Sequence, residues 1–291
     1  MNCLHENIKA EILKETGEVI SDRAINIVRK DAGKKEVKRI EFIINNSEMA
    51  TKIRMFGSFY FNHYKNVLKL NIPEQVLFRY IYLCTYMNYN NQICIVVDGK
   101  KRLATTKDLK SILRLSDSET RKTKNILIEN ELIIINEDKT ISINSKFAIK
   151  GKVRKKSLTG SVRIMEEGIQ EIYEKAKPTE HKKLALLIKV LPHVNFDYNI
   201  VCFNPEERNQ EDIIPMNLKE LCNAVGYDET NTTRLKRDLL KLKVGGNPVI
   251  AVTEIYRGHA VSINPAIYYK GNNPKAMDWL MTLFKIVNKK K

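Results

Sequence analysis

The sequence lacks the features by which metal-binding, secreted and membrane proteins are usually recognised. Its five cysteines are scattered without a C-x-x-C pair, and its five histidines form no ligand-spaced cluster with them. This argues against a zinc site and against a disulfide framework. No apolar run is long enough to span a membrane, and the N-terminus has no signal-peptide core. We therefore expect a cytoplasmic protein with reduced thiols, no metal and no membrane contact.

Catalytic signatures are also missing. There is no G-x-x-x-x-G-K-[ST] motif for a P-loop ATPase, and no H-x-H pair accompanies a tyrosine as a metal-dependent nicking site would require. One catalytic alternative stays open, a tyrosine recombinase, for which Arg257, His259 and Tyr268 or Tyr269 are the nearest candidates. Because those positions have a simpler explanation in a strand pair and its exit loop, we expect no catalytic residues, no cofactor and no enzymatic activity.

What the sequence has in excess is positive charge. Its 291 residues include 50 lysines and arginines against 34 acidic residues, giving a formal net charge of +16. Such an excess favours a polyanionic partner, because neutralising phosphates releases their counterions. The alternative is a basic protein without a special partner. The length and a hydrophobic content of 43% suffice for one large domain or two of ordinary size.

Two stretches of the chain resemble each other. "ISINSKFAIKG" occupies residues 141–151 and "VSINPAIYYKG" residues 261–271. Upstream of each, periodicity and turn residues predict the same order: helix, strand, helix, turn, helix, strand, strand. "TTKDLKSILRLSDSETRKTKNIL" aligns with "MNLKELCNAVGYDETNTTRLKRDLL", which places Ser116 on Asp228 as helix caps and Leu127 on Leu239 as core residues. This agreement favours a duplicated domain over chance similarity, with a longer strand pair in the second copy.

A helix, a tight turn, a second helix and a strand pair are typical of a winged helix-turn-helix. The predicted fold class is α+β, with two tandem winged helix-turn-helix domains joined by a basic linker. The predicted boundaries are an N-terminal extension (1–55), domain 1 (56–151), the linker (152–163), domain 2 (164–272) and a C-terminal helix with a basic tail (273–291).

The second helix of each copy carries small, polar and basic residues early in its length, as a helix in the DNA major groove requires. An ordinary solvated helix face is the alternative. The predicted double-stranded DNA contacts are Ser118, Thr120, Arg121, Lys122, Lys124 and Asn125 in the first copy, and Thr230, Asn231, Thr233, Arg234 and Arg237 in the second.

Further predicted DNA contacts lie outside these helices. The linker is strongly basic, and Arg154, Lys155 and Lys156 are placed to contact phosphates or to form a tether. Arg257, in the turn between the last two strands, is placed to contact phosphate or the minor groove. The corresponding first turn, "NEDK", is partly acidic, and we expect no contact from it.

Three flanking segments complete the prediction. "RIMEEGIQEIYEKA", from Arg163, indicates an amphipathic helix that packs on its own domain. "EFIINN" (residues 41–46) is typical of a strand. "PKAMDWLMTLFKIVNKKK" indicates a C-terminal amphipathic helix with Met277, Leu280, Leu283 and Phe284 directed inward.

The pattern "TGEVI... GSFYFNHYKNVLKLNIPEQVLFRYIYLCTYMNYNNQICIVV... TKDLKSILRLSDSETRKTKNILIENELI... ISINSKFAIKG", over residues 16–151, resembles the RepL-like replication initiators of small plasmids from low-G+C Gram-positive bacteria. Those proteins have a single winged-helix module, so the tandem layout departs from them. The tandem is instead similar to initiators of iteron plasmids, which place two winged helices on one origin repeat.

The resemblance implies a replication initiator that binds duplex DNA at a plasmid or phage origin. Host replication proteins and a second copy of the chain are further candidate partners. A transcriptional regulator of a mobile element is the alternative, because it would use the same helices. An RNA-binding protein lacks support, since no aromatic stacking motif is present.

Overall fold

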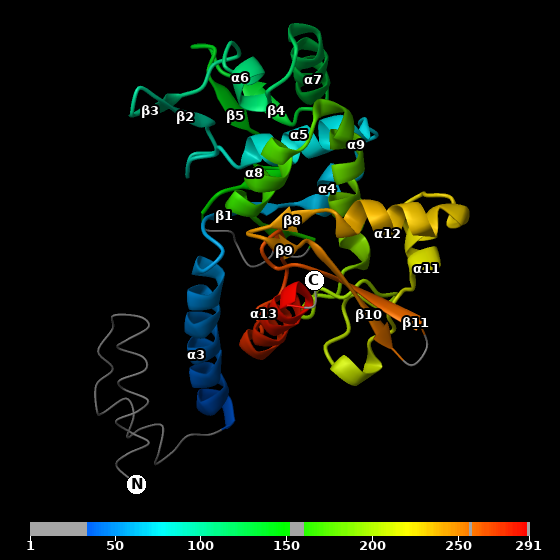
Figure 1. The fold of residues 1–291 in the computed structure, drawn as a ribbon. Helices are drawn as coiled ribbons and strands as arrows, with labels where there is room; N and C mark the ends of the chain where they lie inside the picture. Colours follow the sequence, from blue (N-terminus) through cyan, green and yellow to red (C-terminus); the bar gives the residue numbers. More distant parts are fainter. Residues whose placement is uncertain (1–33, 152–159, 256–257, 290–291) are drawn as a thin grey trace.

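A computed structural model describes residues 34–151, 160–255 and 258–289 of the chain. It combines helices with short antiparallel strands, which confirms the α+β class (Figure 1). The elements up to residue 151, the end of the first half, are α3 (Lys34–Arg54), β1 (Phe59–Asn62), α4 (Tyr64–Val67), α5 (Glu74–Cys84), β2 (Cys94–Val97), β3 (Lys100–Leu103), α6 (Leu109–Leu113), α7 (Asp117–Glu129), β4 (Ile133–Ile135), β5 (Ile141–Ile143) and β6 (Ala148–Ile149).

The second half extends from residue 160 to residue 272, and one helix follows it. Its elements are β7 (Val162–Met165), α8 (Glu166–Lys175), α9 (His181–Leu184), α10 (Leu186–Lys189), α11 (Leu218–Ala224), α12 (Thr232–Leu240), β8 (Lys243–Val244), β9 (Asn247–Pro248), β10 (Ile250–Ile255), β11 (Gly258–Ile263) and β12 (Tyr268–Tyr269), followed by α13 (Pro274–Lys289). Short 3-10 turns lie at Pro178–Glu180, Leu191–His193, Gln210–Asp212 and Glu229–Asn231.

The repeated sequence endings supply the outer strands of a four-stranded sheet. The strand order is β12-β7-β1-β6, and β1 and β7 pair antiparallel at the centre, with Phe59 opposite Met165. Each half therefore contributes one inner strand and its own exit strand. The predicted linker ended at residue 163, but Val162 and Arg163 belong to β7. The last two residues of the predicted linker therefore lie in a strand, whose pairing with β1 joins the two halves.

The lysine of each repeated "KG" ending is largely buried. The Lys150 ammonium lies 2.7 Å from a carboxylate oxygen of Glu166 at the start of α8. The Lys270 ammonium donates to the carbonyls of Leu191 and Val194, and burial lowers the pKa of Lys270 to about 7. It also lies 4.7 Å from the centre of the Tyr64 ring. Both lysines thus contact the opposite half, so the repeated ending helps to join the halves.

The predicted helices of the first half are confirmed. Leu109 and Leu113 of α6 are buried, and Leu127 holds α7 to the core. Ser116 caps α7, since its hydroxyl oxygen accepts a hydrogen bond from the backbone N–H of Glu119. Between α5 and α6 the chain also forms the β2–β3 hairpin, and β4 pairs with β5 after α7.

The second half follows the same order with local differences. The single helix predicted from Pro178 is divided into short segments (α9, α10 and flanking 3-10 turns). Asp228 acts as a cap, as predicted, but it caps the 3-10 turn Glu229–Asn231 that precedes α12. The strand predicted at residues 199–204 is reduced to isolated bridges, such as Ile200 with Ser262. The β10–β11 pair is longer than β4–β5, in agreement with the prediction.

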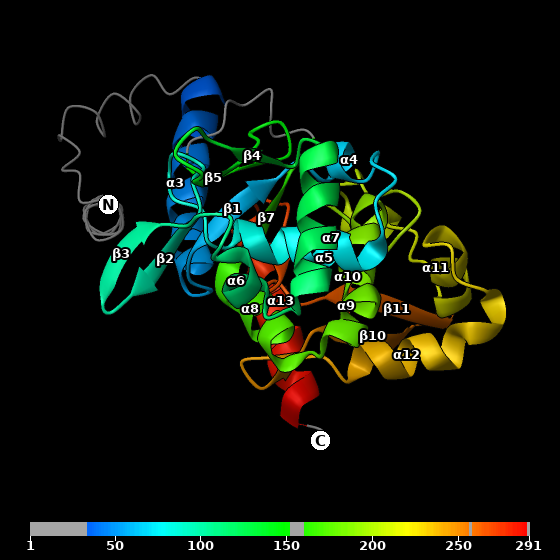
Figure 2. The same ribbon diagram turned by 90° about the horizontal axis from the view of Figure 1, so that it is seen from above.

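One continuous apolar core runs through both halves. Helix α8 packs against α5 of the first half as well as against β8 of its own half, so the prediction that it packs only on its own domain was incomplete. Tyr173 of α8 stacks on Tyr82 at 3.6 Å between ring centres, and its hydroxyl donates to the Leu113 carbonyl. The buried side of α8 therefore packs on both halves, and Figure 2 shows α8 beside α6 of the first half.

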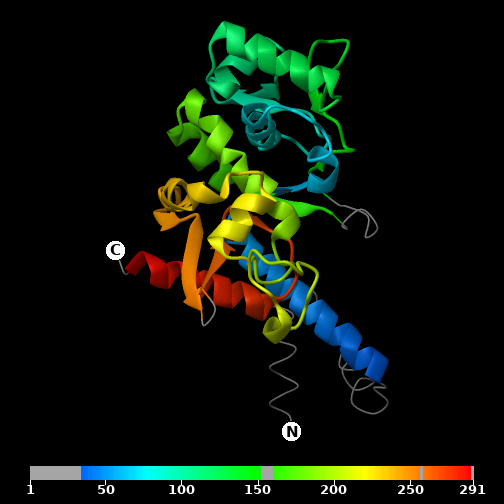
Figure 3. The same cartoon turned by 90° about the vertical axis from the view of Figure 1, so that its right-hand side faces the viewer.

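A second, smaller core joins the two ends of the described chain. Residues 41–46, predicted as a strand, lie in helix α3, whose residues Met49 and Ile53 pack against Met277, Leu280 and Phe284 of α13 (Figure 3). The local pattern of "EFIINN" suits a strand, but the stretch continues into the helical turns that carry Met49 and Ile53, and those residues anchor α3 on α13. The inward residues predicted for α13 are confirmed, with Leu283 only partly buried. No helix in the described part of the chain is both long and apolar enough to cross a membrane.

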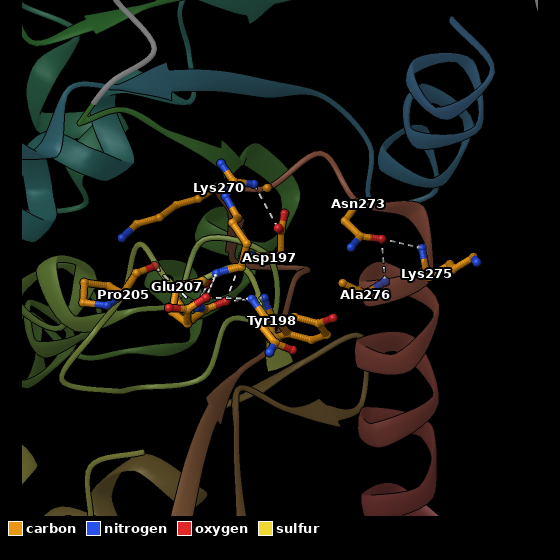
Figure 4. A network of polar contacts seen from close by, with 12 residues as sticks. Asp197, Tyr198, Pro205, Glu207, Lys270, Asn273, Lys275 and Ala276 are labelled. Atoms are coloured by element: carbon orange, nitrogen blue, oxygen red, sulfur yellow. Dashed lines mark hydrogen bonds and ion pairs between the residues drawn. The ribbon is translucent and has the colours of Figure 1, made fainter. Parts of the chain in front are cut away.

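A loop in the second half is held by a polar network beside the start of α13 (Figure 4). The side-chain oxygen Oδ1 of Asn195 accepts hydrogen bonds from the backbone N–H groups of Asp197 and Tyr198, and its side-chain NH2 donates to the backbone carbonyls of Pro205 and Glu207. These bonds fix the loop that replaces, in the second half, the β2–β3 hairpin of the first half.

Candidate nucleic-acid interface

Helix α7 presents one polar and basic face to solvent. Four of its predicted contact residues are exposed, namely Ser118, Arg121, Lys122 and Asn125, whereas Lys124 is half-buried. Thr120 was predicted to contact DNA but is buried, and its hydroxyl donates to the Ser116 carbonyl inside the helix. That prediction was wrong because Thr120 lies on the side of the helix that packs on the core. The exposed set offers two cations and two hydrogen-bonding side chains, the groups that contact phosphates and base edges.

A buried arginine on α5 holds this helix. Arg79 is only 3% exposed, and its guanidinium donates to Glu119 at 3.0 Å and to Thr123 at 2.8 Å, both on α7. Its third hydrogen bond goes to His181 Nδ1 of α9 at 3.3 Å. A planar donor fork of this kind fixes the orientation of its partners. The helix that would read DNA is therefore bonded to both halves of the protein through one side chain.

The histidine in this network makes stability depend on pH. Burial and the neighbouring Arg79 cation lower the pKa of His181 from 6.5 to about 4. Between these two pH values the unfolded chain binds a proton that the native state does not. We therefore expect His181 to add stability above pH 6.5, and to lose it as pH falls towards 4, by up to about 1.4 kcal/mol per pH unit.

Urea unfolding between pH 7.5 and pH 4.5 measures this effect against a His181→Gln variant, in which an amide oxygen replaces the imidazole acceptor. The difference in unfolding free energy between the two proteins should change steeply across the window. Glu180 and Arg79, the charged neighbours of His181, are present in both proteins. If the unfolding free energies of the two proteins change in parallel with pH, His181 titrates normally and its environment is not as described.

Helix α12 presents a similar polar and basic face with an acidic neighbour, as α7 does where Lys122 lies 3.7 Å from Glu119. Thr233, Arg234 and Arg237 are exposed, but both arginines lie 3.9 Å from Asp238 on the same helix. Thr230 and Asn231 do not lie in α12, because they belong to the 3-10 turn before it, where the Thr230 hydroxyl bonds to the Asp228 carboxylate. Their assignment to the recognition helix was wrong because that helix begins later than the cap position indicates.

The remaining predicted contacts cannot be placed. Arg154, Lys155 and Lys156 of the linker, and Arg257 of the second strand-pair turn, lie outside the described residues. In the first turn, Asp138 accepts hydrogen bonds from the backbone N–H and hydroxyl of Thr140, which lowers the pKa of Asp138. That acidic side chain thus shapes the turn itself.

The tyrosine candidates for a recombinase are buried. Tyr268 and Tyr269 form β12 at the edge of the central sheet, and both side chains are inaccessible to solvent. Burial raises the pKa of both hydroxyls, and the Tyr269 hydroxyl donates to the Asn273 carbonyl. Neither hydroxyl is accessible to a DNA strand in this structure. Across the described ranges, no group of three His, Cys, Asp or Glu residues could hold a metal ion.

Two features of the interface were not predicted as functional. Arg79 stands within the apolar helix "EQVLFRYIYLC", where a charged residue among buried positions could have indicated a buried polar network. For the β2–β3 hairpin the sequence predicted one strand and a turn, so the second strand was not predicted and no role was assigned to the segment.

Comparison with protein-family models, curated proteins and solved structures finds no match for this chain. Its function is therefore inferred from the chemistry and placement of its exposed residues.

Proposed function

We propose that the chain is a sequence-specific duplex-DNA-binding protein that acts as a replication initiator at a plasmid or phage origin. In this proposal α6, α7, β4 and β5 form one winged helix, and α11, α12, β10 and β11 form a second. The observation that carries it is α7, whose exposed face bears Arg121, Lys122 and Asn125 while Arg79 holds its buried side. A rigidly held polar helix is what base recognition requires.

The net charge of +16 supports a polyanionic partner. Because the halves share one core, α7 and α12 keep a fixed separation, and both would bind one continuous DNA site. The attachment of α7 through the buried Arg79, for which α12 has no equivalent among the described residues, favours α7 as the main reader of sequence. Cytoplasmic location, a non-catalytic role and contact with host replication proteins follow from the proposal.

Footprinting over the DNA of the element that encodes the protein tests the proposal. Protection of repeated sites within an origin supports initiation, whereas protection of a single promoter would indicate a transcriptional regulator. Nicking of the DNA, or a covalent protein–DNA adduct, would contradict a non-catalytic role. Absence of any preferred sequence would overturn specific binding altogether.

Replacing Arg121 with alanine should relax specificity at one part of the site, with a loss of about 1–3 kcal/mol for the preferred sequence. Arg234→Ala should act at another part of the same site. Replacing Arg154, Lys155 and Lys156 should instead weaken binding to all sequences, because phosphate contacts carry no sequence information. Binding to specific and scrambled duplexes across a salt series separates these effects. The assignment fails if the linker variants alter specificity while Arg121→Ala lowers affinity uniformly.

A further inference from the structure

The β2–β3 hairpin projects from the end of the molecule that carries α6 and α7 (Figures 1 and 2). Its strands pair in register, with Val96 opposite Lys101 and Val97 opposite Lys100. Asp98 and Gly99 form the turn, with φ angles of 51° and 73°. Two consecutive positive φ angles suit a tight hairpin turn that continues the twist of the strands. The hairpin tip is therefore a defined structure.

The outer part of this hairpin is uncovered. Val96 is 70% exposed and Val97 is 40% exposed, and Lys100 and Lys101 are exposed with no ion pair to any described residue. Directly opposite residues of an antiparallel pair lie on the same face. Each face of the tip thus carries one valine and one lysine. An isolated two-stranded hairpin is marginally stable in water, so the tip depends on its attachment to the rest of the protein.

The base of the hairpin is held firmly. Arg102 donates two hydrogen bonds to the Asp108 carboxylate, at 2.9 and 2.7 Å, and Asp108 also accepts from the backbone and hydroxyl of Thr105. The Thr106 N–H donates to the Lys139 carbonyl in the β4–β5 turn. The hairpin therefore leaves the protein between the start of α6 and the β4–β5 turn, so its tip is held relative to α7.

We propose that this hairpin is a third DNA-contacting element, whose lysines bind backbone phosphates at one edge of the site read by α7. The inference rests on the proposed function. The first helix of a helix-turn-helix crosses the DNA backbone, and in this protein the base of the hairpin is bonded to Asp108 just before α6 and to the β4–β5 turn. A hairpin attached to both would lie along the same backbone. Lys100 and Lys101 outnumber the single carboxylate at the tip, Asp98, which favours a polyanion over a basic or neutral partner.

The test is a Lys100→Gln/Lys101→Gln double variant of the full chain. The probe is a duplex that the unaltered protein selects from a random-sequence library, together with a scrambled duplex of equal length. The matched control is Lys275→Gln/Lys285→Gln, which removes two exposed lysines from α13 at the other end of the molecule (Figure 1). All three proteins should unfold at the same temperature, because the four side chains lie on the surface.

We expect the hairpin variant to reduce the slope of log K against log salt by about two units on both duplexes. The ratio of specific to scrambled affinity should not change, and hydroxyl-radical protection should be lost at one edge of the site only. The control variant should retain the wild-type slope and footprint.

Three outcomes overturn the proposal. If the wild type selects a sequence and the hairpin variant keeps the wild-type slope and footprint, the hairpin does not contact DNA. The proposed function then stands without the hairpin. A changed specificity ratio assigns the hairpin to base reading and contradicts a phosphate contact. If the wild type selects no sequence and binds neither duplex, the proposed function fails, and the hairpin proposal fails with it.

Discussion

Replacing Tyr173 with alanine should lower the free energy of unfolding by about 3–5 kcal/mol, the range for truncating a large buried aromatic side chain. Tyr173 fills the junction between the halves, where it stacks on Tyr82 and on the His181 ring, with 4.2 Å between the centres of the Tyr173 and His181 rings. The substitution would leave a cavity in the shared core and would leave the Leu113 carbonyl without its donor. Urea denaturation measures the loss.

The matched control is Tyr173→Phe, which removes only the hydroxyl and should cost about 0.5–1.5 kcal/mol. Trp279 is the only tryptophan, so its fluorescence reports on α13, which packs on the second half, while far-UV circular dichroism reports on the whole chain. The two signals should change together in the wild type, because one core should unfold in one transition. Two separate transitions in the circular dichroism signal would show that the halves are independent domains, whereas a separate transition in fluorescence alone would report independent unfolding of the smaller core around α13.

Replacing Arg79 with methionine should cost about 2–4 kcal/mol of stability and should also weaken specific DNA binding. The change leaves the buried Thr123 hydroxyl and His181 Nδ1 without their donor, and α7 loses its link to α5. Arg79→Lys should recover little of the lost stability or binding specificity, because an ammonium group cannot reproduce three hydrogen bonds from a planar guanidinium. Chemical denaturation gives the stability, and a specific-to-scrambled affinity ratio gives the effect on α7.

Arg114 provides the control for Arg79. It is 56% exposed and pairs with Glu174 at 3.2 Å, so Arg114→Met should cost no more than about 1 kcal/mol. If the role of Arg79 is purely structural, its substitution should lower stability. The specific-to-scrambled affinity ratio should then stay unchanged after correction for the fraction of folded protein. Equal effects of the two substitutions would contradict the buried network.

The elements with strong local signals were predictable. Ser116, followed by an apolar spacing that places Leu127 inward, predicts the start and the buried face of α7. The apolar face of α13 was predicted in the same way. Thr120 was misassigned because the spacing that identifies a helix does not fix where its exposed face ends. Thr230 was misassigned because a cap residue can begin a 3-10 turn before the helix proper.

The relation between the halves could not be predicted, because it depends on contacts between distant residues. Nothing near Val162 indicates that it pairs with Asn62. The sequence around Tyr173 indicates an amphipathic helix but not which surface covers it. Residues 41–46 have a strand-like pattern but lie in α3, whose later residues Met49 and Ile53 pack on α13, since a tertiary contact of one helix can override a weak local preference.

By itself, the sequence determined the mixed fold class, the duplicated order of elements, the caps of the central helices and the positive charge that indicates a polyanion. These follow from spacing and composition, which are local properties. Only the tertiary structure decided that the halves form one core, that Arg79 joins α7 to both of them, and that the β2–β3 hairpin stands uncovered beside the β4–β5 turn. Burial and exposure are set by which distant surfaces meet, and no local pattern encodes that pairing.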